Sequence, residues 1–355
     1  MERQVTSLRS GYSTGACAAA AAKAAAEVLL GGDASPVVEV PFPDGTRVAL
    51  ATLYARMSGE DAEAAVRKDA GDDVDATHGA VVAASLSWAK DGDVTFVAGE
   101  GVGMVTKPGL SIPPGEPAVN PVPRGMIRAA IREVTKLPVR LVLSIPGGKA
   151  LAEKTFNPRL GVVGGLSILG TTGRVRPFDL EALRDALKCA LDVAAACGIR
   201  APVLVPGHIG EKAARRHFRL SDPQVIEVVN EWVFVLDRIG EYRFDRLLVL
   251  GHPGKLAKLA MGHWDTHSAR SPGAVSFVAA LAETLLGRAL PPCPTVEGVL
   301  GALPAPDRER VAAKLAGRVR EAVVHRMGSG RDAAVALVDM RGDILGFEGE
   351  LATWT

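Results

Sequence analysis

The chain has 355 residues, a length at which two domains are more common than a single hydrophobic core. Its 41 Lys and Arg residues balance 40 Asp and Glu residues, and no long basic run is present, which argues against nucleic acid as a partner. The first residues lack the apolar stretch of a signal peptide, and charged residues interrupt the long apolar runs, so we expect a soluble, cytoplasmic protein without membrane helices.

The four cysteines form neither a CxxC pair nor the dense pattern of a disulfide scaffold. We interpret Cys17, Cys189, Cys197 and Cys293 as reduced thiols. Cys189 and Cys197 lie in an alanine-rich helical pattern, where a small buried side chain is the expected role.

The first predicted element is a helix over the run ACAAAAAKAAAEVLL. Ser13 and Thr14 supply hydroxyls that can cap its start, and Gly31 and Gly32 end it. Apolar residues then alternate with small or polar ones over 82–88, as expected of a half-buried strand.

Turn residues at 91–93 and the apolar run VTFVAG follow this strand, so the sequence predicts a β-hairpin. A helix is predicted next, with Ile127, Ala130, Ile131 and Val134 on one stripe, and then a strand over VRLVLSIPGG. The first domain is therefore expected to be a mixed α+β domain.

A further helix is predicted between Asp179, which can cap it, and Gly198, which stops it. Its leucines repeat at helical spacing. We place the domain boundary near the end of this helix, which gives an α+β domain over 1–195 and a second domain over 196–355.

The second domain is predicted to alternate strands and helices, which is typical of a parallel α/β sheet. The strand APVLVPG is followed by a helix, a second helix over 225–236, the strand RLLVLGH and another helix. The tail is expected to form a charged helix over 307–327 and a hairpin that turns at 341–343.

A short internal echo pairs VLVPGHIGEKA with LLVLGHPGKLA, so that Gly207 and His208 correspond to Gly251 and His252. Each unit is an apolar strand, a GHxG turn and a helix. Both histidines should therefore lie at carboxyl ends of strands, where ligands bind in open α/β sheets.

The stretch VTFVAGEGVG resembles a dinucleotide-binding loop only superficially, because Gly99, Gly101 and Gly103 follow an apolar strand. Such a site needs a helix directly after the glycines, whereas Lys107 and Pro108 begin an extended loop. We favour a structural turn or a binding turn of another class.

The segment VRKDAGDDVDATHGA concentrates charge in one loop, which we call the acidic loop. It contains Lys68, Asp69, Asp72, Asp73, Asp75 and His78. Close carboxylates suggest a cation site or coupled proton uptake, but a solvated turn is the favoured interpretation, and the spacing does not match a calcium loop.

The segment GHWDTHS places His263, Asp265 and His267 at alternate positions, a set that can bind zinc. No fixed-spacing metal motif accompanies it, so ordinary hydrogen bonding is favoured and no protein-bound metal is expected.

The stretch TFNPRLGVVGGLSILGTTGRVRPF is dense in glycine and has neither helical nor strictly alternating periodicity. Its backbone must approach something closely. Its polar residues, among them Asn157, Arg159, Thr171, Thr172 and Arg174, offer donors and cations suited to carboxylates. A packed junction and a binding site are equally compatible with these residue types.

Several of these segments together resemble the CbiD family, the cobalt-precorrin-5B C(1)-methyltransferases of anaerobic cobalamin synthesis. The resemblance rests on GYSTGACAAAAAKAA, VRKDAGDDVDATHGA, GEGVGMVTKPGL, NPVPRGMI, TFNPRLGVVGGLSILGTTG and GHPGKLAKLA, in the order of the family. These motifs span roughly 8–268, and the terminal hairpin is also similar to the family's ending.

The resemblance implies methyl transfer from S-adenosylmethionine to carbon C1 of cobalt-precorrin-5B, a tetrapyrrole, to give cobalt-precorrin-6A. Other enzymes of the corrin pathway are further candidate partners. It also implies a first domain similar to a permuted ribosomal-S5-like fold and a small four-stranded parallel α/β domain. The chain departs from the family pattern at His208, Pro253, His263 and Asp265.

We assign candidate roles on this basis. The predicted S-adenosylmethionine site comprises Gly207, His208, Gly251, His252, Gly254 and Lys255. The predicted macrocycle site comprises Lys107, Arg124, Asn157, Arg159, Gly164, Gly165, Thr171, Thr172 and Arg174. Candidates for acid or base chemistry are Asp72, His78 and His252, and the acidic loop is a candidate contact for the donor's sulfonium or ribose. A tetrapyrrole carrier without methyl transfer and a metal-dependent hydrolase are the alternative functions.

Overall fold

The computed structural model describes residues 8–328 and 330–355, and the chain divides into two compact units, Met1–Ala182 and Leu183–Thr355. The boundary lies before α4 has completed its first turn, rather than at the predicted 195/196. Helix α4 (Leu180–Ala196) buries Leu187, Leu191 and Ala194 in the core of unit 2, and this burial assigns most of the helix to that unit.

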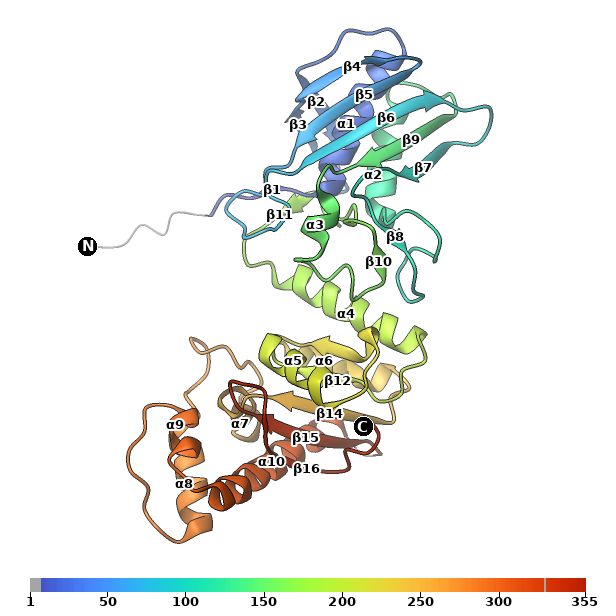
Figure 1. The fold of residues 1–355 in the computed structure, drawn as a ribbon. Helices are drawn as coiled ribbons and strands as arrows, with labels where there is room; N and C mark the ends of the chain where they lie inside the picture. Colours follow the sequence, from blue (N-terminus) through green and yellow to red (C-terminus); the bar gives the residue numbers. More distant parts are fainter. Residues whose placement is uncertain (1–7, 329) are drawn as a thin grey trace, which may run out of the picture. The chain divides into compact units, whose positions relative to one another are not determined.

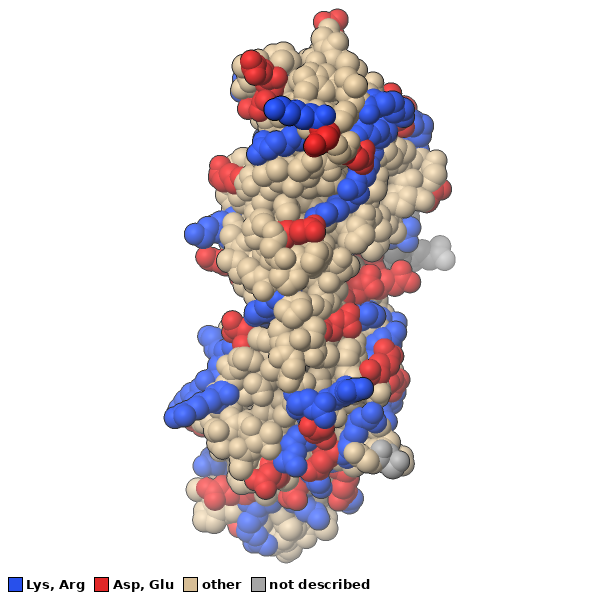
Figure 2. Space-filling model, turned by 90° about the vertical axis from the view of Figure 1, so that its right-hand side faces the viewer, with Lys and Arg blue, Asp and Glu red and all other residues tan. Residues whose placement is uncertain are grey.

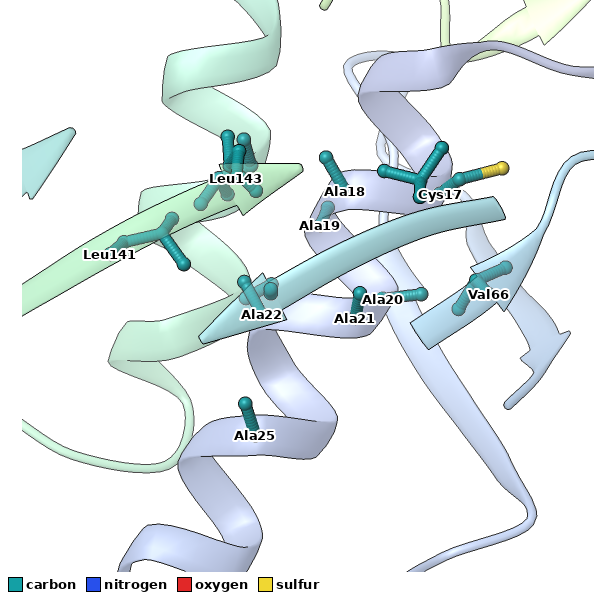
Figure 3. Close-up of a cluster of buried hydrophobic side chains, with 14 of the residues drawn as sticks. Cys17, Ala18, Ala19, Ala20, Ala21, Ala22, Ala25, Val66, Leu141 and Leu143 are labelled. Atoms are coloured by element: carbon teal, nitrogen blue, oxygen red, sulfur yellow. The ribbon is translucent and has the colours of Figure 1, made fainter. Parts of the chain in front are cut away.

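The first helix of unit 1 is α1 (Thr14–Leu29), and the Ser13 hydroxyl accepts a hydrogen bond of 3.2 Å from the Ala16 N–H and caps the helix as predicted. Almost the whole surface of α1 is buried, and Figure 3 shows its small side chains against Val66, Leu141 and Leu143 of the sheet. Alanine lets the helix axis approach both the sheet and α2 (Pro121–Arg132) closely.

The main sheet of unit 1 has five strands in the order β4-β5-β6-β9-β7, with α1 and α2 packed on one face (Figure 1). The strands are β4 (Tyr54–Ser58), β5 (Asp61–Arg67), β6 (Val81–Trp88), β7 (Val94–Ala98) and β9 (Val139–Ser144).

The predicted hairpin of β6 and β7 is wrong, because β9 lies between them. It pairs antiparallel with β6 and parallel with β7. Val139, Leu141 and Leu143 of β9 are fully buried, and the pairing of this strand with a neighbour on each side keeps them in the core.

Shorter elements gather at one end of this sheet (Figure 1). Two-stranded ladders join β1 (Gly11–Tyr12) to β11 (Arg174–Val175) and β8 (Met104–Val105) to β10 (Val162–Val163). Helix α3 (Gly148–Ala152) follows β9, and a separate hairpin pairs β2 (Val37–Pro41) with β3 (Arg47–Ala51).

Unit 2 is built on a five-stranded sheet in the order β13-β12-β14-β15-β16. The strands are β12 (Val203–Val205), β13 (Val225–Glu227), β14 (Arg246–Gly251), β15 (Asp332–Val338) and β16 (Ile344–Glu348). The first four are parallel, and β16 closes the sheet as the antiparallel arm of the predicted terminal hairpin. A mixed α/β architecture is thus confirmed for the chain.

The predicted helix over 225–236 is wrong in its first half. Val225–Glu227 is strand β13, and helix α6 (Trp232–Arg238) begins five residues later. Val225 and Ile226 are β-branched and buried beside β12, a setting that favours a strand over a helix.

Helices cover both faces of this sheet. Helix α5 (His208–His217) packs on one face, where Val203, Val205, Leu248 and Leu250 point. The opposite face carries α6, α7 (Pro253–Ala260) and α10 (Ala305–Met327), with α8 (Val275–Leu286) and α9 (Val296–Gly301) beside them. Among the described residues, no helix is long and apolar enough to cross a membrane.

Basic and acidic side chains are interspersed on the face that Figure 2 shows, without a broad field of one sign. This agrees with the balanced composition of the chain.

Candidate functional site

The sheet of unit 2 reverses its strand order between β12 and β14. From β12 the chain moves through α5 to β13 on one side, and then through α6 to β14 on the other side of β12. The helices after β12 and β14 pack on opposite faces, so the carboxyl ends of these two strands flank a switch point. Ligands of open α/β sheets bind at this position.

Small residues bring the two strand ends close together. A Cβ on Gly251 would lie 2.6 Å from both Cδ and Cγ of Pro206, and one on Gly210 would lie 2.7 Å from the Leu250 carbonyl oxygen. The glycines of the GHxG echo are therefore required for the packing of β12 against β14.

Charged side chains meet at the same edge. Glu227 ends β13, and its Oε1 lies 3.6 Å from where a Cβ on Gly207 would be. Lys255 donates a hydrogen bond of 3.2 Å to the Pro206 carbonyl oxygen. Burial lowers the pKa of Lys255, and the negative charge of Glu227 partly opposes this shift.

The amino end of α7 is closed by His252. Its Nδ1 accepts a hydrogen bond of 3.0 Å from the Gly254 N–H, and its carbonyl oxygen accepts from the N–H groups of Lys255 and Leu256 at 3.1 and 3.2 Å. Pro253 has no N–H to offer. His252 Nε2 lies 2.7 Å from Glu297 Oε2, so both ring nitrogens are engaged and the amide groups of this helix start are used.

The amino end of α5 differs. Its cap is Gly207, which has φ 156° and ψ −174°, a conformation that only glycine adopts readily, and a glycine cap has no side chain that could accept from the first N–H groups of the helix. The first N–H groups of a helix have no acceptor inside the helix. This end is therefore the better of the two for binding an anionic group.

The loop after β13 is strained at Val229. The Glu231 N–H donates to the Val228 carbonyl oxygen at 3.0 Å, which closes a tight turn with Val229 at φ 59°. A β-branched residue is disfavoured there by about 1 to 3 kcal/mol. Such strain is often found beside functional sites.

In unit 1, three of the predicted motifs converge around the start of α1. The Tyr12 N–H donates to the Asp69 carbonyl oxygen at 2.7 Å, the Ser13 N–H to Gly173 at 2.9 Å and the Gly15 N–H to Leu169 at 3.0 Å. We call segments 9–15, 68–79 and 155–175 together the motif cluster.

The charges of the acidic loop are largely paired. Asp69 binds the Arg9 guanidinium at 2.5 and 2.9 Å, which lowers the pKa of Asp69 to about 2. Burial opposes ionisation of Asp75, but hydrogen bonds from the buried Lys68 and from Thr77 outweigh it and lower its pKa. Asp69 and Asp75 are therefore ionised and paired with cations, and residues 71–76 and His78 of this loop line an open depression of about 440 Å³.

The two proton-transfer candidates in this loop bind backbone groups. Asp72 Oδ2 accepts from the Arg9 N–H at 2.6 Å, and His78 Nδ1 accepts from the Ala70 N–H at 3.2 Å. The neutral form of His78 must then carry its proton on Nε2.

Most glycines of the 155–176 stretch pack against unit 1 itself. A Cβ on Gly165 would lie 2.2 Å from the Gly101 backbone, one on Gly170 2.3 Å from the Ser13 side chain, and one on Gly173 2.7 Å from the Phe42 ring. Gly164 has open space around it. The close approach predicted for this stretch is real, and for these three glycines the partner is protein.

The same stretch exposes apolar and cationic side chains. Phe156, Val163 and Leu169 are 39%, 57% and 47% exposed. The Arg159 guanidinium lies over the Phe156 ring at 5.6 Å, and Arg174 lies over the Phe42 ring at 5.1 Å. Thr171 and Thr172 are exposed beside them. This surface can bind a large, flat, carboxylated ligand.

Other predicted macrocycle residues support the surface from within. Buried Asn157 accepts a hydrogen bond from the Ser167 hydroxyl at 3.1 Å. Arg124 donates to the Val119 and Pro117 carbonyl oxygens and pairs with Glu116 at 2.7 Å. The Lys107 side chain lies against Gly161.

The histidine-rich segment before α8 does not assemble the zinc set that we considered. Asp265 pairs with Arg270 at 2.5 Å and accepts from the His267 N–H at 3.0 Å. Across residues 8–328 and 330–355, no group of three or more His, Cys, Asp or Glu side chains is arranged to hold a metal ion.

Sequence reasoning missed two residues at the switch point, Glu227 and Val229. A carboxylate about 20 residues after a glycine turn is a signal for a nucleotide site in a βαβ unit. The helix predicted over 225–236 concealed it, because Glu227 then did not end a strand.

The chain is similar to known proteins of one family. Residues 1–177 match the family described as CbiD, and residues 265–349 match the CbiD C-terminal domain. A cobalt-precorrin-5B C(1)-methyltransferase of Syntrophotalea carbinolica is 53% identical over 98% of this chain and 99% of its own length. One of the same description from Moorella thermoacetica is 40% identical over 96% of this chain and 95% of its own. A crystal structure of the cobalamin biosynthesis protein cbiD from Archaeoglobus fulgidus is 28% identical, with a TM-score of 0.40 over 74% of this chain and 83% of that one. The chain belongs to the CbiD family.

Proposed function

We propose that this protein is a methyltransferase that moves a methyl group from S-adenosylmethionine to carbon C1 of cobalt-precorrin-5B and yields cobalt-precorrin-6A. The observation that carries this proposal is the 53% identity, over nearly the full length of both chains, to a relative described as a cobalt-precorrin-5B C(1)-methyltransferase. Its compartment, on this proposal, is the cytoplasm, in agreement with four free cysteines.

The reaction breaks the bond between the methyl carbon and the sulfonium sulfur and forms a carbon–carbon bond with an electron pair of the macrocycle. S-adenosylhomocysteine is the other product. The residues of this chain need only hold the two partners in line, with about 3 to 3.5 Å between the reacting carbons, which can contribute several kcal/mol of the rate enhancement.

We assign the donor to the carboxyl edge of the unit 2 sheet, around Gly207, His208, Gly251, His252, Gly254 and Lys255. Two observations support this. The edge is a topological switch point, and α5 begins at Gly207, a cap residue that has no side chain to occupy the first N–H groups of the helix. The donor carboxylate is assigned to α5 rather than α7, because His252 and Pro253 leave the start of α7 without available amides.

We assign the macrocycle to the exposed surface of the motif cluster. Arg159, Arg174, Thr171 and Thr172 would bind its carboxylates, with Lys107 as a further cation. Gly164 offers open space for a close approach, while Gly165, Asn157 and Arg124 would maintain the shape of the loops.

We propose a structural role for Asp72, His78 and His252, which would hold the backbone of the site in place. Each holds backbone N–H groups in the described structure. A methyl transfer to an electron-rich carbon needs no strong general base in the rate-limiting displacement, so these contacts favour a supporting role over proton transfer.

We also propose that unit 1 is a permuted relative of the ribosomal-S5-like fold. Its five-stranded sheet covered on one face by α1 and α2, with α1 ahead of all five strands, supports this arrangement.

Anaerobic incubation with cobalt-precorrin-5B and S-adenosylmethionine tests the proposed activity. We expect the macrocycle to gain the mass of one methyl group and one equivalent of S-adenosylhomocysteine to appear. A macrocycle that binds tightly but gains no mass would instead indicate a carrier protein.

The donor site is tested by Gly251→Val and Lys255→Ala. A side chain at 251 must displace Pro206 from the end of β12, so we expect S-adenosylmethionine affinity to fall by about 10-fold or more in calorimetry. Gly273→Val is the matched control, because a Cβ there has open space. Unchanged affinity in both folded variants would refute the assignment.

A further inference from the structure

We propose that Glu227 binds the ribose hydroxyls of the methyl donor at the switch point of the unit 2 sheet. This inference rests on the proposed donor site and deepens it, by naming the residue that recognises the nucleoside part of the donor.

The topology of unit 2 brings Glu227 beside the glycine turn from Gly207 to Gly210. This turn lies in one βαβ unit, made of β12, α5 and β13, whose second strand ends in Glu227. In nucleotide-binding units of this kind an acidic residue about 20 residues after the glycine turn binds the ribose. Glu227 has this separation from Gly207 and lies on the strand adjacent to β12.

The Glu227 carboxylate lies next to the glycine turn. Glu227 Oε1 lies 3.6 Å from where a side chain on Gly207 would begin. Because Gly207 has no side chain, a ligand that crosses the glycine turn can reach this oxygen. A ribose presents two neighbouring hydroxyl donors, and an ionised carboxylate accepts two hydrogen bonds side by side.

A cation already lies at the same edge of the sheet as Glu227. The Lys255 ammonium is near enough to the Glu227 carboxylate for the two charges to attract each other. Recognition of uncharged hydroxyls therefore fits this carboxylate better than attraction of the cationic sulfonium. The two roles predict different responses to the neutral product, S-adenosylhomocysteine.

Calorimetric titration of the full-length protein with S-adenosylhomocysteine and its 2′-deoxy and 3′-deoxy forms tests the inference. We expect the wild-type protein to bind at least one deoxy form about 10- to 100-fold more weakly than the parent compound, because a charge-assisted hydrogen bond is lost. Glu227→Ala should lose similar affinity for the parent compound and should no longer discriminate against the deoxy form. Glu227→Gln, which keeps the size of the side chain, should show an intermediate loss.

Asp245→Asn is the matched control. Asp245 precedes β14 at the opposite edge of the same sheet and pairs with Arg200 at 2.6 Å, so its loss should leave both affinity and discrimination unchanged. Thermal unfolding of each variant checks that the fold is retained.

The outcomes separate this inference from the proposed function. If Glu227→Ala still binds the deoxy forms more weakly than the parent compound, by the same factor as the wild type, the ribose role is overturned. The proposed methyltransferase activity is not affected by that result. The ribose role is also overturned if Glu227→Ala loses affinity for S-adenosylmethionine but not for S-adenosylhomocysteine, because that result indicates attraction to the sulfonium. A wild-type protein that binds neither compound would refute the donor site and Glu227 together.

Discussion

His252 shows how the surroundings of one residue decide between two roles. A histidine after a parallel strand is a reasonable candidate for proton transfer. Here its Nδ1 accepts the Gly254 N–H and its Nε2 lies 2.7 Å from Glu297 Oε2, so the ring joins the start of α7 to α9. A residue with both nitrogens engaged in this way is well suited to holding a helix end in place.

Replacement of His252 by asparagine should therefore be tolerated better than replacement by alanine. Asparagine can cap a helix, and loss of a cap costs about 1 kcal/mol. We expect His252→Ala to lower the melting temperature and weaken donor binding, and His252→Asn to restore most of both. Loss of turnover in His252→Asn, with donor affinity intact, would instead point to a direct part in the reaction.

The strain at Val229 makes a second prediction at this scale. Glycine adopts φ 59° without penalty, so Val229→Gly should raise the melting temperature of unit 2 by a few degrees, the effect of about 1 kcal/mol. Val229→Ala is the control, because it shortens the side chain but keeps the disfavoured φ. Equal melting temperatures for the glycine and alanine variants would argue against strain.

At the scale of elements, a charged network ties α1, α2 and the β2–β3 hairpin together. Lys23 is almost buried in the alanine-rich helix, and its Nζ donates to Glu133 at 2.6 Å and to the Glu39 carbonyl oxygen at 2.8 Å. Arg47 donates to both carboxylate oxygens of Glu133 at 2.8 and 3.0 Å. Glu133 therefore compensates a buried cation and connects three elements.

This network predicts a pH-dependent contribution to stability. Hydrogen bonds from Arg47 and then Lys23 lower the pKa of Glu133 from 4.5 to about 2. Because the pKa is depressed in the folded state, the stabilisation is complete above pH 4.5 and is lost as the pH falls towards 2. Glu133→Gln should destabilise the protein by about 1 to 3 kcal/mol at pH 7 and by clearly less near pH 3.

Denaturant titrations of the wild-type protein and Glu133→Gln at both pH values measure this difference. Glu63→Gln serves as the control, because Glu63 lies on β5 and its ion pair with Arg56 is largely exposed. A difference between wild type and Glu133→Gln that stays constant from pH 7 to pH 3 would contradict the assignment.

At the scale of the whole molecule, each unit has its own hydrophobic core. The main buried cluster of unit 1 draws on residues from Ala16 to Ile168, and those of unit 2 on residues from Leu187 to Trp354. In unit 2, Trp354 is almost completely buried and donates from its indole N–H to the Ala201 carbonyl oxygen at 2.8 Å, which ties the chain end to the sheet.

We expect residues 178–355 to fold without unit 1. Expressed alone, they should unfold cooperatively on heating and bind S-adenosylhomocysteine, since the proposed donor residues all lie within unit 2. The same fragment carrying Gly251→Val is the control for specific binding. A fragment that is expressed but melts without a cooperative transition would show that unit 2 depends on unit 1.

Several features of this protein follow from the sequence alone, because they depend on local physics. High helix propensity and a hydroxyl cap place α1, apolar runs place the strands β12 and β14, and glycine density around 161–173 requires close backbone approaches. The family motifs, read in order, led to the CbiD family, which the comparisons confirm.

The tertiary structure decided what these local patterns leave open, namely which segments become neighbours. A turn at 91–93 looks like a hairpin, yet β9 takes the place beside β6 and buries Val139, Leu141 and Leu143 completely, because burial is decided by competition among all strands. In the same way, Val225–Glu227 is predicted as part of a helix but becomes a strand through its contacts with β12, and only then does Glu227 come to lie beside Gly207. The sequence determined the elements that local propensity and caps define, and the need for close packing. The long-range contacts determined the rest of the elements and what is packed against what.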